Sequence, residues 1–119
     1  MLNDATGFEK IYIACGYTDL RLGIDGLACL IKSQFLINPF TPNTLFLFCG
    51  RKPDRIKGLI WEGDGFLLLY KRLEASKYSW PRSITEVQEM SPQQFRWLME
   101  GLTINPTKTV KKVYPKTPN

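Results

Sequence analysis

The chain has 119 residues, of which 44% are hydrophobic and 13% aromatic, enough for one folded domain with a core and too apolar for a disordered chain. Its formal net charge is +5, and it contains no histidine. The lack of histidine excludes Ser-His-Asp and Cys-His nucleophile pairs, and the three cysteines have neither the paired spacing nor the fourth ligand of a structural zinc site.

The acidic residues and the first residues of the chain bear on whether the protein is an enzyme and where in the cell it is located. The carboxylates are scattered singly among basic or apolar neighbours, so no pair is placed for two-metal chemistry. We therefore expect a protein that is not an enzyme and uses no cofactor and no metal. The apolar runs are too short to span a membrane, and the first residues do not have a cationic segment followed by an apolar one. We expect a cytoplasmic protein without a membrane partner.

The positive charge is concentrated at the C-terminal end. The first 100 residues hold 12 basic and 11 acidic side chains, whereas the residues after Glu100 hold four lysines and no acid. We interpret residues 1–105 as a single domain and residues 106–119 as a basic, flexible tail. Such a tail suits a polyanionic partner, but it can equally serve as a solubilising end. The lysines of this tail are Lys108, Lys111, Lys112 and Lys116.

The first half of the chain predicts a strand, a helix and a second strand. Residues 10–16 alternate apolar and polar side chains and are typical of a strand. Residues 44–50 are apolar on both faces and predict a buried central strand, which follows a loop rich in proline and asparagine. Between them, apolar residues recur at helical spacing, with Thr18 or Asp19 as the expected N-cap. These apolar residues are Leu20, Ile24, Leu27, Ala28, Ile31 and Phe35.

The segment RIKGLIWEGDGFLLLYKRL, residues 55–73, predicts a β-hairpin. A two-residue loop centred on Gly63-Asp64 or Asp64-Gly65 suits a tight turn, because glycine and aspartate tolerate positive φ. We interpret Asp64 as a turn residue and not as a catalytic acid, since the chemistry of a tight turn already explains an aspartate at this position. Either loop places odd-numbered residues of the first strand opposite even-numbered residues of the second.

This register gives the hairpin two faces of different chemistry. One face is apolar, with Lys71 as its single charge, and contains Ile56, Gly58, Ile60, Leu67, Leu69 and Leu73. The other is aromatic near the turn and basic at its far end, and contains Arg55, Lys57, Leu59, Trp61, Phe66, Leu68, Tyr70 and Arg72. The second face can stack bases and hold phosphates, or its apolar part can pack under a helix and leave only the basic end in water. We favour packing under a helix, because Leu59 and Leu68 are apolar side chains that would contribute little to binding nucleic acid.

The last elements complete an α+β domain. Residues 78–80 predict a short edge strand that ends at Pro81. Ser91, Pro92 and Gln94 form a capping box that starts a helix, whose apolar stripe is Phe95, Leu98, Met99 and Leu102, with Gly101 near its end. The order of elements predicts an antiparallel β-meander sheet of about four to five strands, with two main helices packed on one face of it.

Two groups of residues are candidate binding sites. Arg51, Lys52, Arg55 and Lys57 alternate into the hairpin, and Arg72 lies opposite their end of it, so these residues together with the tail lysines Lys108, Lys111 and Lys112 are the candidate nucleic-acid site. Exposed strand ends are also often basic simply to prevent edge pairing. If the aromatic face is left uncovered, Trp61, Phe66 and Tyr70 form the candidate surface for a protein partner.

Most of the chain resembles a known family. The segments IYIACGYTDLRLGIDGLACLI, LFLFCGRKPDRIKGLIWEGDGFLLLYKRLE and SPQQFRWLMEGL resemble the TnpB-type accessory protein, the Orf2-like product of the second open reading frame, of the IS66 family of bacterial insertion sequences. That protein is distinct from the RNA-guided nucleases that share the TnpB name. The resemblance covers residues 11–102, and its most specific parts are residues 18–21 with 24–27, and residues 61–66 with 70–74.

The resemblance implies a role in DNA transposition. In that family a separate, larger protein carries out strand transfer, so the resemblance implies an accessory protein that binds DNA, the transposase or both, with no catalytic residues to transfer. The alternative is a protein-interaction module that does not contact nucleic acid. Neither hypothesis indicates an oligomeric state. The residues that match the family pattern without an assigned role are Asp19, Arg21, Asp25, Asp64, Lys71 and Arg72.

Overall fold

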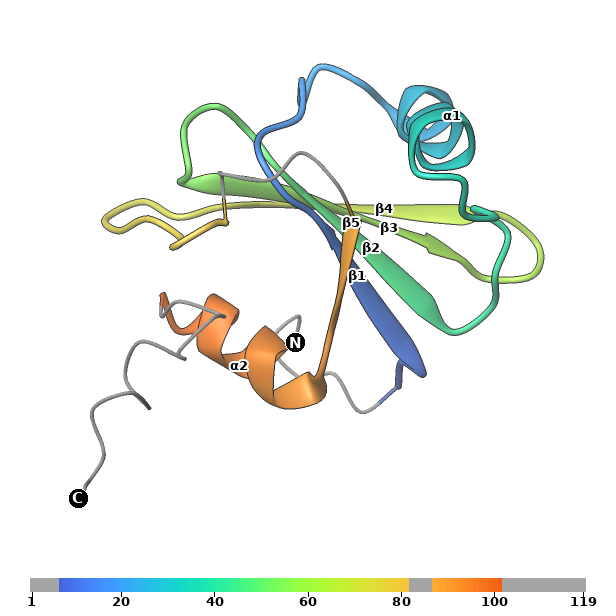
Figure 1. Ribbon diagram of the computed structural model, residues 1–119. Coiled ribbons are helices and arrows are strands. Elements are labelled where there is room, and N and C mark those ends of the chain that lie inside the picture. The colour runs from blue at the N-terminus through green and yellow to red at the C-terminus, as the bar shows by residue number, and fades with distance from the viewer. Residues whose placement is uncertain (1–6, 82–86, 102–119) are drawn as a thin grey trace.

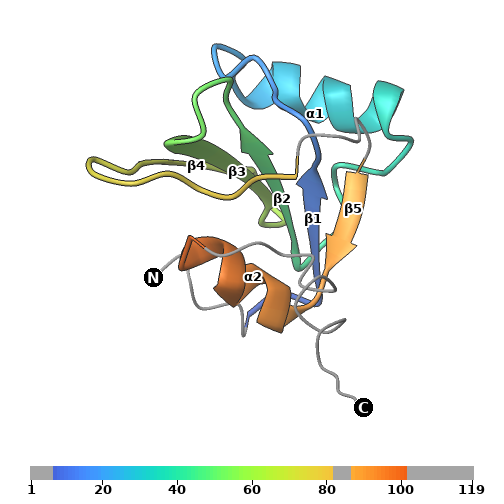
Figure 2. The ribbon, with the colours of Figure 1, turned by 60° about the vertical axis from the view of Figure 1, so that its left-hand side comes forward.

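The computed structural model describes residues 7–81 and 87–101, which form one five-stranded sheet and two helices. The sheet has the strand order β4-β3-β2-β1-β5 and lies between the helices, with α1 over one face and α2 over the other (Figures 1 and 2). The elements are β1 (Lys10–Ala14), α1 (Ile24–Gln34), β2 (Thr44–Cys49), β3 (Arg55–Trp61), β4 (Phe66–Arg72), β5 (Val87–Met90) and α2 (Pro92–Met99).

The predicted α+β class is confirmed, and the sheet is mostly antiparallel. One pair departs from the predicted meander, because β1 and β2 are parallel. Parallel neighbours need a crossover connection, and α1 with its flanking loops supplies it between the end of β1 and the start of β2. As a consequence, the carboxyl ends of β1 and β2 lie at the same edge of the sheet.

The prediction that both helices share one face is wrong. On the α2 side, Ile13 and Leu47 belong to the same buried cluster as Phe95 of α2. On the α1 side, Phe46 and Phe48 pack against the buried stripe of α1. Every residue of β2 is buried, and a strand that is apolar on both faces needs a cover on each face. The central strand therefore requires one helix above the sheet and one below it.

The hairpin has the predicted pairing of odd-numbered with even-numbered residues, and of the two predicted loops it has the one centred on Gly63-Asp64. Trp61 pairs with Phe66, and the backbone N–H of Glu62 donates to the carbonyl oxygen of Gly65 at 2.9 Å, which leaves Gly63 and Asp64 as the two loop residues. Gly63 has φ of +94°, a conformation that glycine adopts without steric strain. On the α1 side Leu59 is fully buried, as the packing interpretation predicts.

The predicted edge strand at residues 78–80 is wrong, and β5 takes the edge position beside β1 instead. Tyr78 and Trp80 are buried in the α2-side core. The backbone N–H of Tyr78 donates to the carbonyl oxygen of Pro53, and the Trp80 indole N–H donates to that of Ala14 at 2.9 Å. These large side chains anchor the return of the chain from β4, so the segment is a buried connection and not a ladder strand.

The two helices begin differently. The predicted cap of α1 at Thr18 or Asp19 is wrong: the helix starts at Ile24 with Gly23 as N-cap and no side-chain cap, because residues 19–22 form a turn first. The predicted capping box of α2 is confirmed, with Ser91 accepting from the N–H of Gln94 and the Gln94 side chain accepting from the N–H of Ser91.

The end of α2 also follows the prediction, since Gly101 has φ of +84° just past the C-cap. Leu102 and the tail lie outside the described residues. Neither helix in the described part of the chain is long and apolar enough to cross a membrane.

Candidate nucleic-acid interface

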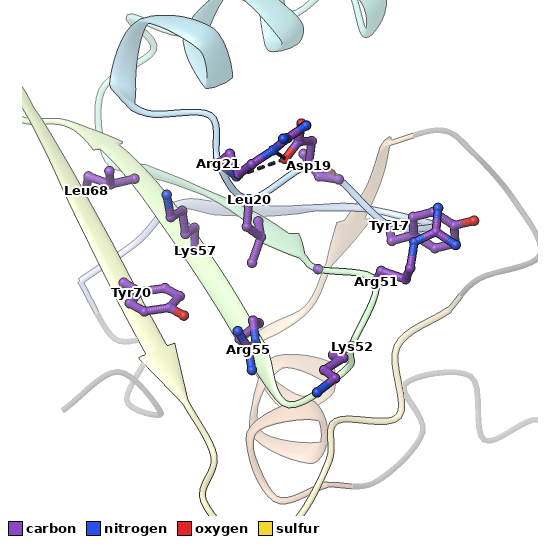
Figure 3. Close-up of a pocket in the computed structure, with 12 residues that line it drawn as sticks. Tyr17, Asp19, Leu20, Arg21, Arg51, Lys52, Arg55, Lys57, Leu68 and Tyr70 are labelled. Atoms are coloured by element: carbon purple, nitrogen blue, oxygen red, sulfur yellow. Dashed lines mark hydrogen bonds and ion pairs between the residues drawn. The ribbon is translucent and has the colours of Figure 1, made fainter.

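A cleft of about 880 Å³ opens on the α1 side of the sheet, at the end of the hairpin that is distant from its turn (Figure 3). The loop after β1 and the loop after β2 both border it, because the parallel pairing brings the carboxyl ends of these strands together. Strands β3 and β4 provide the remaining side chains. We call it the basic cleft; it is lined by Tyr17, Thr18, Asp19, Leu20, Arg21, Gly50, Arg51, Lys52, Arg55, Lys57, Leu68 and Tyr70.

The basic cleft is strongly cationic. Five of its lining side chains are basic, and one, Asp19, is acidic. Arg51 and Lys52 are exposed on the loop after β2, whereas Arg55 and Lys57 are half-buried on β3. Like charges gathered in a concave site raise the local positive potential and concentrate anions there. The arrangement therefore suits a polyanion such as a phosphodiester chain.

Asp19 fixes one of these cations at the rim of the cleft. Its carboxylate accepts from the Arg21 backbone N–H at 3.0 Å, from Nε at 3.0 Å and from Nη2 at 2.8 Å. The hydrogen bond from the Arg21 side chain lowers the pKa of Asp19 to about 2. The Arg21 side chain is 91% exposed and yet is held in one orientation by this forked pair. Two residues of the family pattern thus act locally as a unit.

Two further cations, Arg55 and Lys57, lie on β3, which forms the floor of the cleft, and each is held in one orientation. The Lys57 ammonium donates to the carbonyl oxygen of Leu22 at 3.0 Å and lies 5.8 Å from the centre of the Tyr70 ring. Arg55 Nε donates to Asp54 Oδ1 at 2.9 Å, and this hydrogen bond lowers the pKa of Asp54 and raises that of Arg55. Both side chains are held in place before any ligand arrives, which reduces the entropy lost on binding.

Two tyrosines and a glycine complete the site. Tyr17 and Tyr70 are 53% and 55% exposed, and the Arg51 guanidinium lies 4.6 Å from the centre of the Tyr17 ring. A Cβ atom on Gly50 would lie 3.1 Å from Leu20 Cδ1 and 3.3 Å from Arg55 Cγ. Glycine therefore lets the loop after β1 approach the floor closely.

The structure brings together part of the predicted basic group. Arg51, Lys52, Arg55 and Lys57 all line the basic cleft, whereas Arg72 does not and pairs instead with Glu74 at 2.9 Å. The tail residues Lys108, Lys111 and Lys112 lie outside the described residues.

The family-pattern residues separate in the same way. Asp19 and Arg21 line the cleft, whereas Lys71 is exposed opposite Ile56, on the α2 side of the sheet. Asp25 lies in the first turn of α1, where its charge complements the helix dipole, and Asp64 lies exposed in the hairpin turn. Only the first two of these residues belong to the site.

The candidate partner surface is divided by the structure. Tyr70 belongs to the basic cleft, whereas Trp61 and Phe66 lie at the hairpin turn and are partly buried. Phe40, which is half-exposed, packs on both, with ring centroids 4.9 Å from Trp61 and 5.2 Å from Phe66. Next to it Leu36 is 85% exposed and has φ of +57°, an uncommon conformation for a leucine.

Sequence reasoning missed Tyr17 as a site residue. The signal that could have found it is the parallel pairing of β1 and β2, which places the loop after β1 beside the loop after β2. Within the described ranges no group of three cysteine, aspartate or glutamate side chains is placed to hold a metal ion.

Comparison with known proteins identifies a family and relatives that match most of the chain. The model of the family described as IS66 Orf2 like protein matches residues 9–109. Two proteins of Sinorhizobium fredii (strain NBRC 101917 / NGR234), named uncharacterized protein y4hO and uncharacterized protein y4jC, are each 33% identical over 93 residues. The alignment covers 78% of this chain, 80% of the first protein and 79% of the second. No solved structure matches.

Proposed function

Because the chain belongs to the IS66 Orf2-like family, we propose that it is a non-catalytic accessory protein for the transposition of a bacterial insertion sequence, and that its basic cleft binds the DNA of the element. The observation that carries this proposal is the convergence of five basic side chains on one cleft. Contacts of lysine and arginine with phosphates supply most of the affinity of proteins for nucleic acid.

The chemistry of the cleft favours binding over catalysis. Its one lining carboxylate, Asp19, is held by Arg21 and has a pKa of about 2, so it is a weak base and is not placed to receive a proton. The side chains of Arg55, Lys57 and Arg21 hold their positive charges in fixed positions, which suits the phosphates of a nucleic-acid backbone. The transposase of the element would then perform the strand transfer on DNA that this protein holds.

The test is direct binding across a salt series. DNA from the end of the element, labelled with a fluorophore and supplied both as a duplex and as separated strands, is titrated with the protein at 50 to 200 mM salt. We expect binding to at least one form, with an affinity that falls as the salt concentration rises, because counterions are released from the phosphates. Absence of binding to both forms, or an affinity independent of salt, would contradict the proposal.

A second candidate function is favoured by the apolar loop of residues 36–40. Leu36 and Phe40 are exposed apolar side chains, and with Ile37 and Pro39 they line a groove of about 390 Å³. Exposed apolar patches mark sites of protein interaction. This surface would bind the transposase of the same element, with or without DNA in the cleft.

A pull-down separates the two candidates. The immobilised transposase is incubated with the wild-type chain, with Leu36→Ser/Phe40→Ser, and with a variant in which the cleft cations are replaced by glutamine. If the apolar loop is the contact, only the first variant loses the transposase. Retention of the transposase by Leu36→Ser/Phe40→Ser would exclude this surface.

A further inference from the structure

The two tyrosines of the basic cleft have no evident task in the core. More than half of each side chain is exposed, although a ring of this size is normally covered when it serves packing. Each ring has a cation over one of its faces: Arg51 Cζ lies 4.6 Å from the centre of the Tyr17 ring, and Lys57 Nζ lies 5.8 Å from the centre of the Tyr70 ring. A ring next to a cation matches the two parts of a nucleotide, since the base can stack on the ring while its phosphate meets the charge.

The two rings come from strands that are not neighbours in the sheet. Tyr70 lies on β4 and Tyr17 lies in the loop after β1, and these two strands are three strand spacings of about 4.8 Å, roughly 14 Å, apart. Lys57 and Arg55 lie between them on β3 (Figure 3). A ligand that crosses the strands would therefore meet a ring, then cations, then a second ring.

Double-stranded DNA cannot use this arrangement fully. In a duplex the bases stack on each other inside the helix, and their faces become available to side chains only when they are unpaired. A duplex would contact the cations, but its bases would not stack on either tyrosine. The volume of about 880 Å³ is that of a pocket for a small ligand, which suits a few nucleotides of one strand.

We propose that the basic cleft takes a short segment of single-stranded DNA, with unpaired bases stacked on Tyr17 and Tyr70 and phosphates against Arg55 and Lys57. This inference rests on the proposed function, because it specifies the form of DNA that the same cleft binds. It also gives the tyrosines and the cations separate tasks: the rings select unpaired bases, and the cations provide affinity that depends on salt.

The experiment compares one probe in two forms. A fluorescent 12-nucleotide oligothymidylate is titrated alone and after annealing to oligoadenylate, using the wild-type chain and Tyr17→Ala/Tyr70→Ala. We expect the single strand to bind at least tenfold more tightly than the duplex. The double variant should lose about tenfold or more of its single-strand affinity, keep its duplex affinity and keep its dependence on salt, because base stacking is lost and phosphate contacts are not.

Two controls accompany the double variant. Tyr17→Phe/Tyr70→Phe keeps both rings and should bind the single strand as the wild type does. Phe40→Ala removes an aromatic ring of similar exposure outside the cleft and should leave the single-strand affinity unchanged. Circular dichroism establishes that all variants are folded.

The outcomes distinguish this inference from the proposal on which it rests. Equal affinity for duplex and single strand, or an unchanged single-strand affinity in Tyr17→Ala/Tyr70→Ala, would overturn the inference while DNA binding by the cleft stands. Failure of both forms to bind at low salt would overturn both proposals.

Discussion

Replacing two exposed cations of the basic cleft gives a quantitative test of how it holds DNA. Arg51 and Lys52 lie on the loop after β2 and are both exposed, so Arg51→Gln/Lys52→Gln removes two charges without opening the core. If each side chain contacts one phosphate, each contributes about 0.7 to the slope of log affinity against log salt for a single strand and about 0.9 for a duplex. The double variant should therefore bind with a slope smaller by about 1.4 to 1.8.

That change in slope is measurable by fluorescence anisotropy. Between 50 and 200 mM salt, the wild-type chain should lose about 7- to 12-fold more affinity than Arg51→Gln/Lys52→Gln, as the difference in slope implies. The matched control is Lys10→Gln/Lys71→Gln, which changes the net charge equally at two exposed positions that do not line the cleft. Equal slopes for the cleft variant and the wild type, or an equal loss of slope in the control variant, would refute phosphate contact at this loop.

Four further predictions test the local physical chemistry. Arg21→Gln should raise the pKa of Asp19 from about 2 toward its ordinary value of 3.8, as measured by NMR titration. Any stability that the ionised pair confers should be complete above about pH 3.8 and be lost progressively as the pH falls to about 2. Tyr78→Phe should stabilise the fold by about 1 kcal/mol in urea, because the buried Tyr78 hydroxyl has no hydrogen-bond partner among the described residues; a loss of stability would show that it has one. In the wild-type chain, burial raises the pKa of Tyr78 to about 12, because the folded state disfavours the phenolate. The contribution of Tyr78 to the free energy of unfolding should therefore be constant below pH 10 and decrease as the pH rises toward 12. Ser91→Ala should cost about 1 kcal/mol in the same urea assay, since it removes the capping box of α2, and an unchanged midpoint would contradict that role.

Features that depend on neighbouring residues were predictable from the sequence. The turn residues 63–65 limit the hairpin to two pairings that share the same two faces, and the structure has the one with Gly63 and Asp64 in the loop. The capping box at Ser91 and Gln94 is likewise a local arrangement, and the helix starts where the pattern indicates. The same pairing correctly places Leu59 and Lys71 on opposite faces of the sheet.

Features that depend on distant pairing were not predictable in the same way. The parallel pairing of β1 and β2 joins segments separated by a helix, and no local pattern in either strand specifies it. That pairing brings Tyr17, Asp19 and Arg21 to the cations of the loop after β2 and of β3. Sequence reasoning therefore identified one wall of the site and missed the other.

The face of the sheet that α1 covers and the edge position of β5 were also not predicted from the sequence. The burial of β2 on both faces is visible in its unbroken apolar run, and it already implies a helix on each side, although the order of elements does not say so. The four residues of β5 have little of the composition that is typical of a strand. Tyr78 and Trp80 do have a composition typical of a strand, but these aromatic side chains fill the core and do not belong to a strand.

The measurement that most directly tests DNA binding by the basic cleft is an NMR titration of the ¹⁵N-labelled chain with single-stranded DNA from the end of the element. We expect the largest amide shifts in residues 17–21 and 50–57 and at Tyr70, with little change at Phe40 and Trp61. Shifts centred on residues 36–40 and the hairpin turn, or no shifts at saturating DNA, would contradict it.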